Sequence, residues 1–293
     1  FRATDRYSPA TERQNRERSP QRISVRRNGK GTFMVERVTV NVTEGIADVR
    51  LNRPEKLNAL DAAMFEALVL AGKRVAADRG VRAVVLSGEG RAFCAGLDFK
   101  SFLGDGGSEL LTRDADSIAN RAQRAAWVWQ EVPVPVIAAL HGVVFGGGLQ
   151  IALGADLRIA TAEAELSVME IRWGLVPDMS GTQTLRRLVR LDVAKELTFT
   201  GRIVSGKEAL GLGLVTRLAE SPYATALALA TEIADRSPDA IRASKRLLNA
   251  SGWGSVEEGL ALEAESQRGL LGSPNQVEAV MANLEKRKPR FAD

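Results

Sequence analysis

The sequence of 293 residues contains one cysteine, Cys94, and one histidine, His141. A single cysteine excludes a disulfide within the chain, and no group of cysteines and histidines is available to hold a structural metal. This composition favours a reducing compartment, so we expect a cytoplasmic protein. No apolar run approaches the roughly 18–20 residues of a membrane helix, so no membrane span is expected.

A net positive charge is absent outside the N-terminal segment. The formal net charge is +4, but residues 1–30 alone carry eight arginines and one lysine against three acids. The remainder of the chain is therefore slightly acidic. A basic face for nucleic acid is not indicated there, and no nucleic-acid partner is expected.

Residues 1–33 are rich in arginine, serine and proline and lack apolar periodicity, which predicts a disordered basic tail. An organelle transit peptide is one interpretation, although the acids and the weak amphipathy argue against it. An extension ahead of a natural start at Met34 is the interpretation we favour. A third is an RNA-binding arm, in which case deletion of residues 1–33 would abolish RNA binding.

Strand and helix patterns alternate from about residue 34 to residue 220. Residues 35–42 alternate as a strand, turn at 44–45 and continue as a second strand over 46–51, which indicates a hairpin. Further strands are expected at 81–86, 134–140 and 156–161, with helices between them. Strands that alternate with helices favour parallel pairing and an α/β core over residues 34–220.

From about residue 221 the strand patterns stop and helical patterns dominate. The spacing predicts helices over 223–236, 238–248, 256–271 and 276–286. Residues 221–293 are therefore expected to form a separate C-terminal helical region.

Three consecutive glycines, Gly146 to Gly148, stand at the start of an amphipathic helix. A helix N-terminus presents unpaired N–H groups and a positive dipole end, and glycine lets a ligand approach them. The stretch therefore fits an anion or oxyanion cradle, with a tight strand-to-helix turn as the alternative. It is neither a P-loop nor a dinucleotide fingerprint, because the required lysine and glycine spacings are absent.

A second stretch of small residues, Arg91-Ala-Phe-Cys-Ala-Gly-Leu-Asp98, also follows a predicted strand. Two such turns could each supply one backbone donor to a single carbonyl oxygen. This arrangement stabilises an enolate or a tetrahedral oxyanion, and losing one donor typically costs about 10²–10³ in rate.

Together with other segments in the same order, these stretches resemble the crotonase superfamily of enoyl-CoA hydratases and isomerases. The resemblance extends from about residue 35 to residue 293. The segments that carry it are Leu51-Asn-Arg-Pro, Asn58-Ala-Leu, Ala92 to Asp98, Pro135-Val-Ile-Ala-Ala, His141-Gly, Gly146-Gly-Gly, Gly181-Thr-Gln, Leu197-Thr-Phe-Thr-Gly, Ala209 to Val215 and Leu284-Glu-Lys-Arg-Lys-Pro.

The resemblance implies a spiral of ββα units, with C-terminal helices that build homotrimers or hexamers. It implies an acyl-CoA thioester of fatty acid metabolism as substrate and no metal or redox cofactor. The thioester oxygen would lie between the backbone N–H groups of Leu97 and Gly147. The residues implied to bind substrate and CoA are Lys56, Ala59, Leu60, Ala95, Gly96, Asp98 and Gly146.

The resemblance also implies two acidic positions, which are occupied here by Gln150 and Glu170. Hydration of a double bond needs one group that accepts a proton from water and a proton donor for the α-carbon. The amide of Gln150 can neither accept nor donate a proton near neutral pH. Hydration is therefore the alternative, and double-bond isomerisation with Glu170 as base is the predicted reaction. Gln150 could still hydrogen-bond a water in the site.

Asp178 lies eight residues after Glu170, a spacing similar to that of the acid and base of dienoyl-CoA isomerases. That pattern also has an aspartate where Gln150 stands, so it is matched in part. Asp178 is a candidate partner for Glu170, or alternatively a cap for the helix that starts near Ser180.

Three further possibilities stay open in the sequence. Cys94 and His141 could form a nucleophilic pair, although a small buried filler is the favoured role of Cys94. Trp127, Trp129 and Trp173 could line an acyl pocket, although core packing is favoured. Because Gln150 replaces an acid, the chain could also be an acyl-CoA-binding protein without turnover.

Overall fold

The structure is a computed structural model that describes residues 26–27, 33–35, 37–102, 105–115, 117–252 and 254–293. Most of the predicted tail, residues 1–25 and 28–32, lies outside the described residues. Its described residues include Arg26–Arg27, which form strand β1 and pair antiparallel with β2 (Phe33–Val35).

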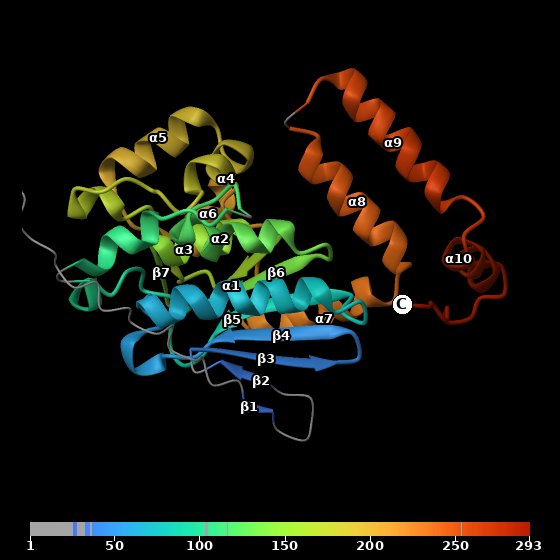
Figure 1. Ribbon diagram of the computed structural model, residues 1–293, viewed down its shortest axis with the longest axis horizontal. Helices are drawn as coiled ribbons and strands as arrows, with labels where there is room; N and C mark the ends of the chain where they lie inside the picture. The colour runs from blue at the N-terminus through green and yellow to red at the C-terminus, as the bar shows by residue number, and fades with distance from the viewer. Residues whose placement is uncertain (1–25, 28–32, 36, 103–104, 116, 253) are drawn as a thin grey trace, which may run out of the picture.

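The main sheet has the strand order β1-β2-β3-β4-β5-β6-β8-β11 (Figure 1). Pairing is antiparallel from β1 to β4 and parallel from β4 to β11, as expected for the α/β core. Its other strands are β3 (Val38–Thr43), β4 (Ile46–Leu51), β5 (Ala83–Gly88), β6 (Val136–Leu140), β8 (Leu157–Ala160) and β11 (Arg217–Leu218).

The strand predicted over residues 35–42 is confirmed over 38–42, as part of β3, but its start is wrong. The chain turns between β2 and β3, and Val35 pairs with Val38 in an antiparallel register. Alternation of side chains continues through a tight turn, so the period of two alone does not reveal the break. The hairpin of β3 and β4, with Thr43 opposite Ile46, is confirmed.

Helices cover both faces of the sheet (Figure 1). One face packs against α1 (Ala62–Ala77), α2 (Arg121–Glu131) and α3 (Gly147–Gly154), and the other against α7 (Pro222–Ala234). Alternate residues of β5 serve the two layers: Val84 and Leu86 face the three helices, whereas Ala83 and Val85 face α7. The first helix of the predicted C-terminal region therefore completes the core.

A second, smaller sheet was not predicted. It has the order β10-β9-β7 and consists of β7 (Val143–Phe145), β9 (Glu165–Ser167) and β10 (Val204–Ser205). β7 follows β6 after two residues and delivers the chain to the three glycines. Strand pairs that split between two sheets before a helix give the ββα units of a crotonase-like spiral.

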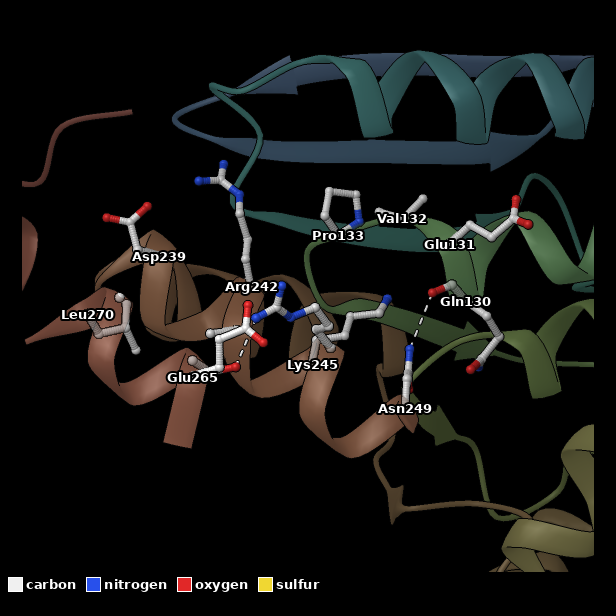
Figure 2. Close-up of a pocket in the computed structure, with 14 residues that line it drawn as sticks. Gln130, Glu131, Val132, Pro133, Asp239, Arg242, Lys245, Asn249, Glu265 and Leu270 are labelled. Carbon is white, nitrogen blue, oxygen red and sulfur yellow. Dashed lines mark hydrogen bonds between the residues drawn. The ribbon is translucent and has the colours of Figure 1, made fainter. Parts of the chain in front are cut away.

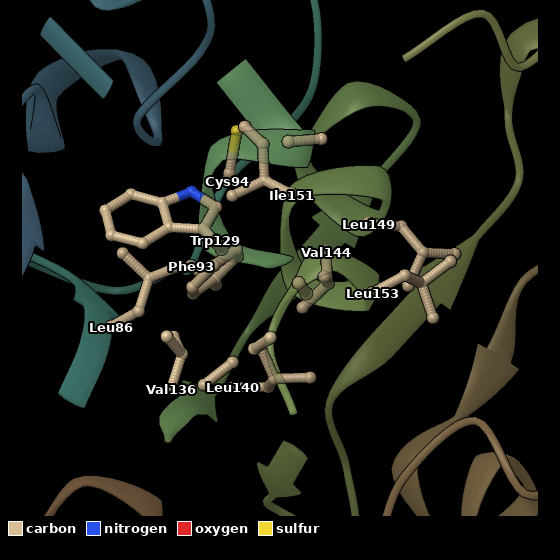
Figure 3. Close-up of a cluster of buried hydrophobic side chains, with 14 of the residues drawn as sticks. Leu86, Phe93, Cys94, Trp129, Val136, Leu140, Val144, Leu149, Ile151 and Leu153 are labelled. Atoms are coloured by element: carbon tan, nitrogen blue, oxygen red, sulfur yellow. The ribbon is translucent and has the colours of Figure 1, made fainter. Parts of the chain in front are cut away.

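A cluster of fully buried side chains joins β6 and β7 to the helices above them (Figure 3). Trp129 of α2 and Phe93 lie at one side of it and Leu149 at the other, and Cys94 lies against Gly148 of the glycine turn. Burial of this kind contributes about 1.5–3 kcal/mol for each large apolar side chain. The turn that carries the glycines thus packs on a cluster of fully buried apolar side chains.

Six further helices belong to the described residues, three of them before β11 and three after α7. These helices are α4 (Gly181–Leu188), α5 (Leu191–Thr200), α6 (Gly206–Leu212), α8 (Pro238–Ala250), α9 (Val256–Leu270) and α10 (Pro274–Leu284). The last three stand to one side of the core (Figure 1). Among the described residues, no helix is both long and apolar enough to span a membrane, and no group of side chains is suited to hold a metal ion.

Lys245 of α8 connects the last three helices, α8 to α10, to the core. Its buried Nζ lies 2.7 Å from a carboxylate oxygen of Asp156 and donates to the carbonyl oxygens of Trp129 and Val134. A cavity of about 680 Å³ lies beside it, between α8, α9 and the end of α2 (Figure 2). This cavity contains none of the predicted site residues.

Candidate active site

A cavity of about 360 Å³ lies where the two small-residue turns meet. Its lining is mainly apolar and includes seven of the predicted site residues, among them Leu97, Gly147, Glu170 and Asp178. Aromatic rings of Phe65, Phe99, Phe102 and Trp173 form much of the remaining wall. The site is therefore an apolar pocket with a few polar groups, as small-molecule sites usually are.

The first turn places the backbone of Leu97 at the cavity. Cys94 N donates to the Val143 carbonyl oxygen and Phe145 N to that of Cys94, so this segment runs alongside β7. Gly96 follows with φ of +86°, and a Cβ there would lie 2.8 Å from the Phe145 carbonyl oxygen. Only glycine allows this approach. Within the described chain, Leu97 N donates to no other residue.

The second turn places the backbone of Gly147 beside the first. Gly146 adopts φ of +50° and its N–H donates to the Ser167 carbonyl oxygen at 3.0 Å. Gly147 then begins α3, and its N–H has no acceptor among the described residues. Its nitrogen lies 3.8 Å from the Cβ position of Gly96. Leu97 and Gly147 thus both line the cavity, as the predicted pair of backbone donors requires.

Glu170 is the buried carboxylate of the cavity. It begins the short helix η4 (Glu170–Trp173) and is 9% exposed. Its Oε1 accepts from Gln150 Nε2 at 2.6 Å, and its Oε2 has no partner in the described structure. Burial raises the pKa of Glu170, and so does the charge of Asp178; its own backbone amide and Gln150 oppose the rise.

Asp178 also lines the cavity, at its more exposed side. Burial raises the pKa of this carboxyl as well. The alternative role as a helix cap is wrong, because α4 has Ser180 as its N-cap and no side chain caps it. The amides of Met179 and Gly181 donate instead to Gln150 Oε1, at 2.8 and 2.9 Å. Gln150 is 2% exposed and does not line the cavity.

The predicted substrate and CoA residues fall into two groups. Ala95, Gly96 and Gly146 line the cavity, whereas Lys56, Ala59, Leu60 and Asp98 do not. Leu60 is fully buried and its N–H donates to the Gly96 carbonyl oxygen. Asp98 forms an ion pair with Arg53 at 2.8 Å, and Lys56 is exposed in the short helix η1 (Pro54–Lys56). Leu60 and Asp98 thus brace the first turn.

Asn58 is a supporting residue whose role the sequence did not reveal. It is fully buried with φ of +56°, and its Oδ1 accepts from the Arg53 amide. Its Nδ2 donates to the carbonyl oxygens of Glu89 and Ala92. These bonds tie the loop before α1 to the segment that leads into the first turn. The partners are about 31 to 34 residues away, so no local pattern indicates them.

We expect Asn58→Ala to lower the free energy of unfolding by about 3 kcal/mol, because two buried backbone groups and one partly buried one lose their partners. Chemical denaturation of the wild type and the variant measures the change. Asn283→Ala, at an exposed position of α10, is the matched control and should stay within about 0.5 kcal/mol. A similar loss in both variants would contradict the tethering role.

Cys94 and His141 do not form a nucleophilic pair. Cys94 is fully buried, its Sγ lies 3.1 Å from the Asn58 carbonyl oxygen, and burial raises its pKa to about 12. The His141 ring instead contacts the Gly90 carbonyl oxygen. The favoured role of Cys94 as a buried filler is confirmed.

The tryptophans differ in their roles. Trp129 is a core residue as predicted, and its Nε1 donates to the Ala125 carbonyl oxygen. For Trp173 the core prediction is wrong: the ring is 58% exposed, lines the cavity and lies 4.2 Å from the Phe99 ring centroid. Trp127 does not line this cavity.

Comparison with known proteins identifies the family to which this geometry belongs. The sequence profile of the family described as enoyl-CoA hydratase/isomerase matches residues 41–293. The chain belongs to the enoyl-CoA hydratase/isomerase family. The match covers both turns, Glu170 and the C-terminal helices, so the predicted membership of the crotonase superfamily is confirmed.

Relatives within the enoyl-CoA hydratase/isomerase family carry different activity names. A probable enoyl-CoA hydratase of Bacillus subtilis is 37% identical over 257 residues, which cover 87% of this chain and 98% of that protein. A mouse mitochondrial Δ(3,5)-Δ(2,4)-dienoyl-CoA isomerase is 35% identical over 256 residues, which cover 83% of this chain and 77% of that protein.

Solved structures of the family share the fold. The crystal structure of an enoyl-CoA hydratase from Bacillus anthracis superposes with a TM-score of 0.81 at 30% identity, and covers 87% of this chain and 99% of that one. The predicted α/β fold with a C-terminal helical region is confirmed.

Proposed function

We propose that this enzyme moves a double bond in unsaturated fatty acyl-CoA thioesters, with Glu170 as the base. One observation carries the proposal: Glu170, whose Oε2 is buried and unpartnered, lines the same cavity as Leu97 and Gly147, whose amides are free. The other position where the family resemblance implies an acid holds the neutral Gln150. A single available carboxylate oxygen suits the return of one proton to the substrate.

The reaction begins with the thioester oxygen between the Leu97 and Gly147 N–H groups. As Glu170 removes a proton, the C–H electron pair spreads into a dienolate whose negative charge gathers on that oxygen. Backbone donors fixed at this point stabilise the charge without having to reorganise. The protonated Glu170 then returns the proton to another carbon, and the double bond shifts with no net gain or loss of atoms.

Asp178 gives the site a second carboxyl group for substrates whose two reacting carbons lie further apart. Its raised pKa favours the protonated form more than in a free aspartate, so it can act as the acid while Glu170 acts as the base. The Glu170 and Asp178 carboxyls line one cavity, which supports this division of roles.

Hydration of 2-enoyl-CoA is the second candidate, and the name of the Bacillus subtilis relative favours it. In that reaction Glu170 would have to activate water and also supply, or relay, the proton for the α-carbon. A binding protein without turnover is the third. The predicted trimeric or hexameric assembly and the independence from any cofactor stay predictions.

Incubation with 2-enoyl-, 3-enoyl- and 3,5-dienoyl-CoA in deuterated water separates these candidates. We expect double-bond migration in a 3-enoyl- or 3,5-dienoyl-CoA. Hydration of 2-enoyl-CoA should be slower than this migration by a factor of about ten or more. Asp178→Asn should slow the dienoyl reaction about 10²-fold, because it removes a proton donor. Rapid hydration without migration would contradict the proposal, and tight binding without any turnover would favour the binding protein.

A further inference from the structure

The orientation of the Gln150 side chain is fixed by its three hydrogen bonds. Its Oε1 accepts from two backbone amides, Met179 N and Gly181 N, which can only donate. The reverse assignment would place an NH₂ group against both amides and the carbonyl oxygen against the Glu170 carboxylate. The NH₂ group of Gln150 therefore faces Glu170, and it does so in a position that is 98% buried.

This orientation makes the two oxygens of Glu170 unequal. An amide NH₂ group can only donate, so Oε1 must act as the acceptor of the 2.6 Å hydrogen bond. A proton on the carboxyl group must then reside on Oε2. Because Oε2 is the oxygen without a partner among the described residues, it is the one carboxylate oxygen left free to accept a proton.

Two glycines leave room for this pair. A Cβ at Gly181 would lie 2.6 Å from Gln150 Oε1, and one at Gly146 would lie 3.3 Å from Glu170 Oε1. Gly146 belongs to the turn that presents Gly147, and Gly181 follows Asp178 by three residues. Gln150 thus lies between the second turn, which carries Gly147, the base Glu170 and the segment that carries Asp178.

We propose that Gln150 is a positioning residue: its amide reserves Glu170 Oε1, confines the transferred proton to Oε2 and fixes the Asp178 segment relative to the base. This inference rests on the proposed function, since it assigns Glu170 the role of base. It differs from the water-binding role expected from the sequence, because the side chain does not reach the cavity.

The role has a signature in the acid limb of the pH–rate profile. A hydrogen bond to the ionised carboxylate lowers its pKa, so loss of the Gln150 amide must raise the pKa of Glu170. Of the charged groups around Glu170, Asp178 is the one whose charge acts on it. Arg172 on η4, and Asp192, Lys195 and Glu196 on the adjoining α5, are exposed.

Gln150→Met tests the proposal, because methionine keeps an unbranched side chain of similar length and removes every hydrogen bond. We expect kcat to fall about 10–100-fold, KM to change less than about threefold, and the acid limb of kcat to move to higher pH. Gln183→Met, in the first turn of α4 with an exposed side chain, is the matched control and should leave the profile unchanged.

Gln150→Glu keeps the inference testable if the methionine variant folds poorly, since its carboxylate can still accept from Met179 and Gly181. It places a like charge beside Glu170, so the acid limb should again move upward. The profile is measured on whichever reaction the wild type performs, migration or hydration, so failure of the proposed function does not decide the inference.

A titration without substrate completes the test. The infrared carbonyl band of the protonated Glu170 is identified as the difference from Glu170→Gln, and its midpoint should rise in both Gln150 variants. An unchanged midpoint and an unchanged acid limb in a folded Gln150→Glu protein would overturn the inference and leave Gln150 a packing residue.

Discussion

Glu170→Gln is expected to lower turnover about 10³-fold or more while acyl-CoA binding persists. The substitution preserves the size of the side chain but replaces the oxygen that accepts the proton with an amide that cannot. Positioned general bases typically contribute about 10²–10⁴ in rate. The cavity wall and the two backbone donors do not depend on this oxygen, so the thioester should still bind.

Stopped assays with each of the three unsaturated thioesters, combined with calorimetry of acyl-CoA binding, measure the two effects separately. In the wild type, the raised pKa of Glu170 places the loss of activity on acidification above the usual range of a glutamate, because the base must be ionised. If Glu170→Gln turned over at the wild-type rate, the assignment of the base would be wrong.

Gly96→Ala should have the second-largest effect, a fall of about 10²–10³ in kcat/KM. The new Cβ would lie 2.8 Å from the backbone oxygen of Phe145, at a residue with φ of +86° that favours glycine. The clash is with backbone of β7, which cannot move aside at low energy. The turn must therefore shift, and it carries the Leu97 amide away from the thioester oxygen. Removing one such donor accounts for the expected loss.

Gly211→Ala is the matched control, because a Cβ on this exposed residue of α6 meets no atom within 4 Å. It should leave the rate unchanged and, within a helix, slightly raise stability. Thermal unfolding of both variants separates displacement of the turn from global unfolding. Wild-type activity in a folded Gly96→Ala protein would exclude Leu97 as an oxyanion donor.

Local patterns predicted the elements whose length and burial follow from their own residues. β4 alternates between core and half-buried positions, and α1 shows its apolar face at helical spacing. The short strands β7, β9 and β10 were missed because two or three residues carry no period. The strand 35–42 was drawn too long because a tight turn preserves the alternation that defines a strand.

Local patterns likewise predicted only the parts of the site that lie within short stretches of sequence. The glycine turn before α3 predicted free amides, and the family spacing pointed to Glu170, because both features lie within short stretches. The role of Gln150 depends on amides 29 and 31 residues away, which no local pattern can reveal. Trp173 was assigned to the core on residue type, whereas its place in a short helix beside Phe99 leaves it at the cavity.

The burial of Cys94 makes its alkylation rate a measure of local stability. This is the one thiol of the chain, it is fully buried, and it lies against Gly148 where the two small-residue turns meet. An alkylating reagent can reach it only when that scaffold opens, so the labelling rate under native conditions measures the free energy of local opening. No second thiol complicates the signal, and a bound thioester that holds the turns together will slow it.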